Sequence, residues 1–135
     1  MPTRREIIQQ FVPTSPLVRH LGIRLEAIED GRARLVLPYR PELATIEDIV
    51  HGGAIASLID AAGMAATWSD DSEPESMSGS TVTLNVNYVA AARGRDLTAT
   101  AEVVRRGRSL VFSEVRVTEP DGRLVATGSV VQRLG

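Results

Sequence analysis

The residues with the clearest chemical potential stand in one apolar stretch, residues 51–68. Asp60 lies in its middle, and a carboxylate that loses its hydration among apolar side chains must be paired, neutralised or exposed. His51 and Gly52 stand at its start, where the unpaired N–H groups and the positive end of a helix can polarise a carbonyl or hold an anion. The alternatives are an Asp60 that emerges at the surface or bonds a neighbour, and a Gly52-Gly53 pair that serves close packing.

His51 and Asp60 are nine positions apart in the sequence. On a helix this spacing corresponds to about 13.5 Å along the axis and about 900° of rotation, so the two side chains lie far apart and on opposite sides. A pair within one chain is therefore excluded. If two copies of the helix run antiparallel across a two-fold axis, His51 and Gly52 of one subunit can approach Asp60 of the other. We therefore predict a dimer with two equivalent composite active sites in its interface.

The stretch 51–68 has the residue pattern of the one long helix in this chain. Its broad apolar face predicts burial against a sheet and consists of Ile55, Leu58, Ile59, Ala62, Ala65 and Ala66. A second stripe, spaced by four and three residues, is small and partly polar and consists of Gly53, Ser57, Asp60, Met64 and Thr67. Because small side chains permit close approach, we expect something other than the sheet to pack on this second stripe.

Most of the remaining chain alternates between apolar and polar residues, as half-buried strands do. The clearest case is 81–88, whose strict period of two predicts that one set of side chains faces the core. The other predicted elements are a short N-terminal helix over 3–12, a helical turn over 41–45, and strands near 22–29, 32–38, 97–103, 109–118 and 123–133. Short turns such as Asp30-Gly31 favour antiparallel pairing, because parallel crossovers need roughly a dozen residues. The predicted fold is α+β, with one long helix covered by an antiparallel sheet of about six strands.

Length and composition limit the possible classes of protein. The 135 residues predict one domain over 1–135, long enough to bury a core of its own. The absence of cysteine excludes disulfides and thiolate metal sites, and the net charge of −2 gives no general field for nucleic acid or an anionic membrane. The sequence predicts neither a signal peptide nor a membrane span. We expect a cytoplasmic protein without nucleic-acid or membrane partners.

The run 49–60, Ile-Val-His-Gly-Gly-Ala-Ile-Ala-Ser-Leu-Ile-Asp, resembles the signature of hotdog-fold acyl-CoA thioesterases of the phenylacetic-acid-degradation (PaaI-like) type. The similarity continues through 81–88 and 107–112 and covers roughly 17–133. It implies a hotdog fold, edge-to-edge homodimers that often pair again into homotetramers, and hydrolysis of an acyl- or aryl-CoA thioester to the free acid and CoA. An acid of the Asp type at position 60 is similar to this clade rather than to the branch that has Glu.

The resemblance also implies roles for particular residues. Asp60 would act as nucleophile or general base on the thioester, the Gly52 amide would polarise the thioester carbonyl, and His51 would position the thioester. Thr81 matches a Ser or Thr that orients water or the acid. Thr45 stands where relatives often carry Asn or Gln, and its shorter side chain implies altered water positioning, low activity or a different substrate. A base and donors aimed at the developing oxyanion are what thioester hydrolysis requires.

Coenzyme A carries phosphates, so we expect local basic groups at its binding site. The first candidate cluster surrounds a predicted turn and consists of Arg105, Arg106, Gly107, Arg108 and Ser109, with Arg93 and Arg95 as a second cluster. The resemblance implies that backbone near Gly107 lies along the pantetheine or nucleotide, and Gly53 is a further predicted substrate contact. Arginines at hairpin turns also serve simply to solvate a sheet edge, and this alternative stays open. The predicted reaction needs no metal and no cofactor other than the CoA of the substrate.

Two other functions remain to be distinguished from hydrolysis. The first is an acyl-CoA-binding hotdog protein without hydrolytic activity, for which Thr45 is the one indication. The second is a hotdog dehydratase or hydratase, which is disfavoured because the sequence has neither a His-Phe-Pro-Gly run nor an Asp-x-x-x-x-His motif.

Overall fold

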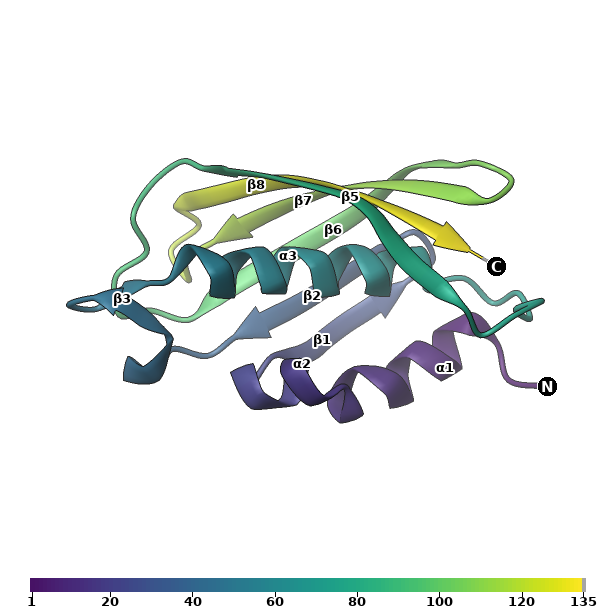
Figure 1. Cartoon of the computed structure of the whole chain (residues 1–135), viewed down its shortest axis with the longest axis horizontal. Coiled ribbons are helices and arrows are strands. Elements are labelled where there is room, and N and C mark those ends of the chain that lie inside the picture. The colour runs from purple at the N-terminus through teal and green to yellow at the C-terminus, as the bar shows by residue number, and fades with distance from the viewer. Residues whose placement is uncertain (135) are drawn as a thin grey trace.

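The computed structural model describes residues 1–134 and has one long helix packed against one face of an antiparallel sheet (Figure 1). The helix is α3 (Gly52–Thr67), and the sheet has six strands in the spatial order β1-β2-β6-β7-β8-β5. The strands are β1 (Arg24–Glu29), β2 (Arg32–Leu37), β5 (Gly79–Tyr88), β6 (Leu97–Arg106), β7 (Leu110–Thr118) and β8 (Leu124–Leu134). The predicted α+β architecture is confirmed.

The broad apolar face of α3 is buried against the sheet at every position that the sequence predicts. Two glycines permit close contact between α3 and β8. A Cβ atom at Gly63 would lie 2.6 Å from Val130 Cβ, and a Cβ atom at Gly128 would lie 2.6 Å from Ile59 Cγ2. Because real Cβ atoms do not approach other carbons so closely, the helix and the sheet interlock at these positions only with glycine.

The second stripe of α3 is the less buried side of the helix. Gly53 is exposed, and Ser57, Asp60 and Met64 are half-buried. Thr67, at the end of the stripe, is instead fully buried, and its hydroxyl donates to the carbonyl of Gly63 at 2.8 Å. The surface left for another partner therefore ends near Met64.

The N-terminal segment forms the predicted short helix, α1 (Arg4–Phe11), followed by a 3-10 turn and by α2 (Pro16–Leu21). Thr3 caps α1, because its hydroxyl accepts the N–H of Glu6 at 3.2 Å while the Glu6 carboxylate accepts the N–H of Thr3 at 2.9 Å. Figure 1 shows α1 and α2 along the bottom of the view, with α1 close to the start of β5. Among residues 1–134, no helix is long and apolar enough to cross a membrane.

The segment before α3 differs in part from its prediction. The helical turn predicted over 41–45 exists as a 3-10 turn, η2 (Pro41–Leu43), and ends there. The prediction was wrong for its last two residues, because β3 (Ala44–Ile46) pairs with β4 (Ile49–Val50) and this pairing draws the backbone into an extended form.

β5 also departs from the strict alternation predicted for it. Its pairing with β8 shifts at Val82, the extra residue of a β-bulge. Thr81 pairs with Gln132, and Leu84 pairs with Val130, and both partners are buried on the helix side of β8. The bulge therefore turns Thr81 and Leu84 toward α3 although they are three positions apart. The predicted uninterrupted period was wrong, and the correction places Thr81 beside α3.

Candidate active site

Asp60 lies on the half-buried side of α3, and its carboxylate is held through one oxygen. Thr81 Oγ1 donates to Asp60 Oδ1 at 2.7 Å, and Gln132 Nε2 donates to Thr81 Oγ1 at 2.6 Å. No group within residues 1–134 donates a hydrogen bond to Asp60 Oδ2. The carboxylate is therefore oriented by a chain of two hydrogen bonds, and its second oxygen remains available to a reacting group.

The start of α3 presents one unpaired amide. His51 is the N-cap: its Nδ1 accepts the N–H of Gly53 at 2.8 Å, and its carbonyl accepts the N–H groups of Ala54 and Ile55 at 3.0 and 3.2 Å. The N–H of Gly52 is the first of the helix, and no acceptor for it lies within the described chain. The Gly52 amide therefore carries the positive end of the helix outward. Because His51 Nδ1 is an acceptor, the neutral imidazole has its proton on Nε2.

β5 contacts these two groups at its opposite ends. Thr81 meets Asp60 near one end, while the hydroxyl of Tyr88 donates to the carbonyl of Gly52 at 2.6 Å at the other. Asp60 and Gly52 are eight positions apart on α3, a rise of about 12 Å. Within one chain the structure does not bring them together. The composite site formed across two subunits stays a prediction.

The other predicted site residues lie apart from the Asp60 carboxylate. Thr45 is exposed in β3, close in the chain to the start of α3. Gly107 forms the turn between β6 and β7, where its N–H donates to the carbonyl of Leu110 at 2.8 Å. Arg108 and Ser109 are exposed in the same turn. They are accessible to a ligand, but the structure alone assigns them none.

Arg106 is turned inward by a second β-bulge. The pairing of β6 with β7 shifts at Val104, so Arg106 pairs with Val111, a buried residue on the helix side. Its guanidinium donates to the carbonyls of Thr67 and Ala66, at 2.9 and 3.4 Å, and so caps the C-terminus of α3. This placement favours a structural role for Arg106, whose predicted contact with CoA remains untested.

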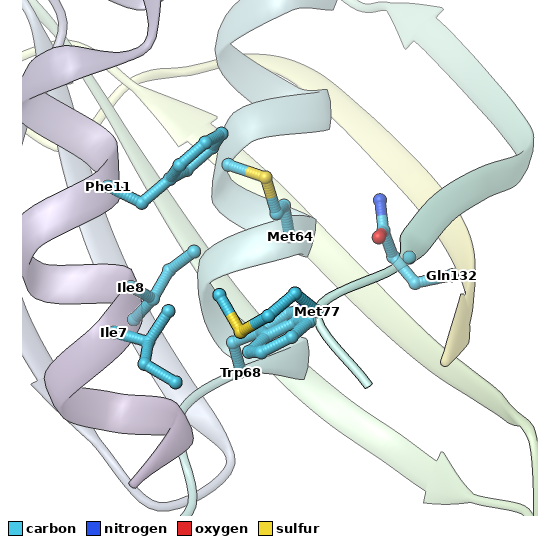
Figure 2. Close-up of a pocket in the computed structure, with 8 residues that line it drawn as sticks. Ile7, Ile8, Phe11, Met64, Trp68, Met77 and Gln132 are labelled. Carbon is cyan, nitrogen blue, oxygen red and sulfur yellow. The ribbon is translucent and has the colours of Figure 1, made fainter. Parts of the chain in front are cut away.

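An apolar pocket opens beside the Asp60 hydrogen-bond chain. Figure 2 shows Met64 of α3 and Trp68, which directly follows α3, opposite side chains of α1, with the amide of Gln132 at the far side of the pocket. Its volume is about 140 Å³, and its lining consists of Ile7, Ile8, Phe11, Met64, Trp68, Met77, Gly79 and Gln132. Since Met64 lies one helical turn beyond Asp60 and Gln132 contacts Thr81, the pocket adjoins the oriented carboxylate.

The sequence profile of the Thioesterase superfamily matches residues 47–126, more than half of the chain. The chain belongs to the Thioesterase superfamily. A protein of Halobacterium salinarum that is named as an esterase is 40% identical over 117 residues. These residues cover 84% of this chain and 77% of that protein. Human acyl-coenzyme A thioesterase 13 is 30% identical over 135 residues, which cover 97% of this chain and 94% of that protein.

A solved structure supports the fold of this superfamily member. The PaaI protein of E. coli, from the phenylacetic acid degradation operon, has a TM-score of 0.83 and covers 98% of this chain and 94% of its own. It is 17% identical, so the likeness shows the fold alone. The resemblance to hotdog-fold thioesterases is confirmed for family and fold. In the part of the superfamily domain that the structure describes, His, Cys, Asp and Glu side chains form no group of three that could hold a metal ion.

Asp70 joins the end of α3 to α1. Its carboxylate lies 3.3 Å from Nη1 of Arg4 and 3.5 Å from Nη1 of Arg106, and Arg4 lies over the ring of Trp68 at 5.9 Å from the centroid. Burial raises the pKa of the Asp70 carboxyl, but hydrogen bonds from Ser72 and the charges of Arg106 and Arg4 outweigh burial and hold this pKa below its ordinary value. This cluster holds α1 against the C-terminal end of α3 and so positions the side of the pocket that α1 forms.

Asp70→Asn should lower the free energy of unfolding at neutral pH by roughly 1–2 kcal/mol, because it removes a charge that two guanidinium groups share. The pKa of Asp70 is lower in the folded state, so its contribution is present above the ordinary pKa of an aspartate and is lost as the pH falls through the folded-state pKa. The difference between the two proteins should therefore narrow in acid. Urea unfolding at a series of pH values measures it.

The matched control is Asp71→Asn, because Asp71 is exposed and pairs with Arg5 alone at 3.3 Å. A pair of this kind contributes little to stability. Equal losses for the two variants would contradict the role assigned to the Asp70 cluster.

The sequence analysis missed Gln132 and the contribution of α1 to the pocket. One signal could have found Gln132: it falls two positions after Val130 in a strand, so alternation puts a carboxamide on the same buried face as a core valine. Buried carboxamides require hydrogen-bond partners. No comparable signal exists for α1, because its contact with α3 depends on tertiary pairing at Asp70.

Proposed function

We propose that this member of the Thioesterase superfamily hydrolyses acyl- or aryl-CoA thioesters, with Asp60 as nucleophile or general base and the Gly52 amide as the group that polarises the thioester carbonyl. Membership of the superfamily makes the chain a thioester hydrolase, and a relative is named as an acyl-CoA thioesterase. The observation that carries the residue assignment is the Asp60 carboxylate, held by Thr81 through Oδ1 alone. No metal and no cofactor other than the CoA of the substrate enters the proposed reaction.

In the general-base form of the reaction, Asp60 removes a proton from a water molecule as its oxygen attacks the thioester carbon. The carbonyl electron pair moves to oxygen, where an N–H donor stabilises the charge. When the carbonyl re-forms, the C–S bond breaks, and the thiolate of CoA takes the proton from Asp60. In the nucleophilic form, Asp60 attacks the thioester carbon, the C–S bond breaks with release of the CoA thiolate, and water then cleaves the resulting anhydride at the Asp60 carbonyl carbon. A single turnover in oxygen-18 water distinguishes them, since label enters Asp60 only in the nucleophilic form.

We propose further that each site combines Asp60 of one subunit with Gly52 of a second copy. β5 is an edge strand of the sheet, and within residues 1–134 no strand pairs with its outer side. Three of its apolar side chains are exposed, namely Val82, Leu84 and Tyr88. A long exposed edge with apolar side chains is a surface that proteins usually cover. A second copy paired antiparallel along β5 would bring the start of α3 in one copy close to Asp60 of the other across a two-fold axis.

The acyl group is proposed to enter the pocket between α1 and α3. A cavity of about 140 Å³ lined by Ile7, Phe11 and Met64 is close in size to one of about 150 Å³ that holds benzene. A phenyl ring or a short alkyl chain fits such a space, whereas an acetyl group leaves most of it unfilled. Filling the pocket removes apolar surface from water and strengthens binding.

The test is the release of free thiol from a panel of acyl-CoA esters by the purified full chain. Phenylacetyl-, hydroxybenzoyl- and hexanoyl-CoA should be hydrolysed with kcat/KM at least about tenfold above that of acetyl-CoA, the effect expected from one buried apolar group. Tight binding of these esters without release of thiol would favour a non-hydrolytic binding protein instead. Equal rates across the panel would exclude the pocket as the acyl site.

A further inference from the structure

Gln132 is a buried polar residue beside the proposed active site. It lies on β8, with 4% of its surface exposed, and pairs in register with Thr81 of β5. Its amide nitrogen donates to Thr81 Oγ1 at 2.6 Å, and Thr81 Oγ1 donates in turn to Asp60 Oδ1 at 2.7 Å. Figure 2 shows its carboxamide at the edge of the apolar pocket. Burial of a carboxamide is costly unless its hydrogen bonds are made, and the bond to Thr81 offsets part of this cost.

The chain of hydrogen bonds has a direction that Gln132 imposes. An amide NH₂ group can only donate, so the Thr81 oxygen facing Gln132 must accept. The Thr81 hydroxyl proton must then point to another acceptor, and Asp60 Oδ1 is at hydrogen-bond distance. Thr81 is thereby fixed as a donor to Asp60. This donation occupies Oδ1 and leaves Oδ2 for the reaction.

The reverse direction requires a different protonation state. If Thr81 donated to Gln132, its oxygen could only accept at Asp60, and a favourable contact would need a proton on the Asp60 carboxyl. A protonated Asp60 serves neither as base nor as nucleophile. An amide donor at position 132 therefore determines that the Thr81 hydroxyl proton points to Asp60.

We infer that Gln132 is a positioning residue, which acts through Thr81 to hold Asp60 as a hydrogen-bond acceptor with one oxygen free. The inference rests on the proposed role of Asp60. It assigns Gln132 no contact with the reacting atoms.

Charged groups on the surrounding elements do not replace this chain. The titratable residues of β5, β8, α1 and α2 are Tyr88, Arg133, Arg4, Arg5, Glu6, Arg19 and His20. Tyr88 is bonded to Gly52, Arg4 and Arg5 pair with Asp70 and Asp71, and Glu6 caps α1. Within residues 1–134, none of them pairs with Asp60.

The experiment replaces Gln132 by Met, which keeps the length of the side chain and removes its donor. We expect kcat with phenylacetyl-CoA to fall about tenfold, the effect of one hydrogen bond to a charged network, with KM unchanged. Gln10→Met, the same change at an exposed position of α1, is the control and should alter neither quantity.

A double-mutant cycle with Thr81→Val separates positioning from a general structural effect. If Gln132 acts through Thr81, the Gln132→Met change should cost almost nothing further in the Thr81→Val protein. Additive losses, or a raised KM with an unchanged kcat in Gln132→Met, would overturn the inference while the proposed function stands. Should the Met variant not fold, Gln132→Leu repeats the cycle. Absence of hydrolysis by the unaltered chain would overturn both proposals.

Discussion

Replacing Asp60 by Asn should reduce kcat for acyl-CoA hydrolysis by about 10³-fold or more, since it removes both a base and a nucleophile. Asn has nearly the same shape, and its carbonyl oxygen can still accept the hydrogen bond from Thr81. The variant should therefore keep its fold, its oligomeric state and its affinity for a substrate. Thiol release measures the rate, and circular dichroism during heating measures the stability.

The control for this prediction is Asp71→Asn, which removes an exposed carboxylate remote from the hydrogen-bond chain. Its rate should equal that of the unaltered protein. A residual rate in Asp60→Asn above about a tenth of normal would remove Asp60 from the mechanism, because a loss that small corresponds to a single hydrogen bond.

The fold could be predicted because its elements have strong and separate periods. The apolar face of 51–68 has helical spacing, and its residues are buried where predicted. The bulges at Val82 and Val104 could not be predicted, since a bulge depends on which residue the partner strand offers. Their consequences are large. One turns Thr81 toward Asp60, and the other turns Arg106 toward the end of α3.

The two halves of the candidate site differ in how far the sequence could define them. Asp60 and Gly52 stand out because a carboxylate and a pair of glycines are unusual in an apolar helix. Gln132 is separated from Thr81 by 51 positions, and only strand pairing brings the two together. The spacing of His51 and Asp60 predicts correctly that they do not meet within one chain. What faces each of them across a subunit contact depends on an interface that one chain does not contain.

Gly52→Pro should lower kcat by about 10²–10³-fold, the loss typical of one missing oxyanion donor. Proline removes the N–H and nothing else that α3 needs, because Gly52 is the first residue of the helix, where proline is well tolerated. The residue before it, His51, has φ −60° and ψ 135°, which suits a position before proline. The cap from His51 to Gly53 is left intact.

Gly52→Ala is the matched control. An added Cβ lies 3.1 Å from Tyr88 Cζ in either variant, so both must displace the tyrosine ring by a small amount. Alanine keeps the N–H, and its kcat should fall much less than that of the proline variant. Equal losses would assign the effect to crowding at Tyr88 and would exclude the Gly52 amide as the oxyanion donor.

Mixed dimers of the Gly52→Pro and Asp60→Asn chains decide whether the site is shared. If Asp60 of one subunit works with Gly52 of the other, each mixed dimer has one site in which both residues are intact and one in which both are altered. With random pairing half of the dimers are mixed, so co-expression of two inactive chains should restore roughly a quarter of the normal rate. If both residues served the same site within one chain, every site in the mixture would lack one of them, and no activity would return. Co-purification through two different tags isolates the mixed dimer, in which the restored rate should reach about half of normal.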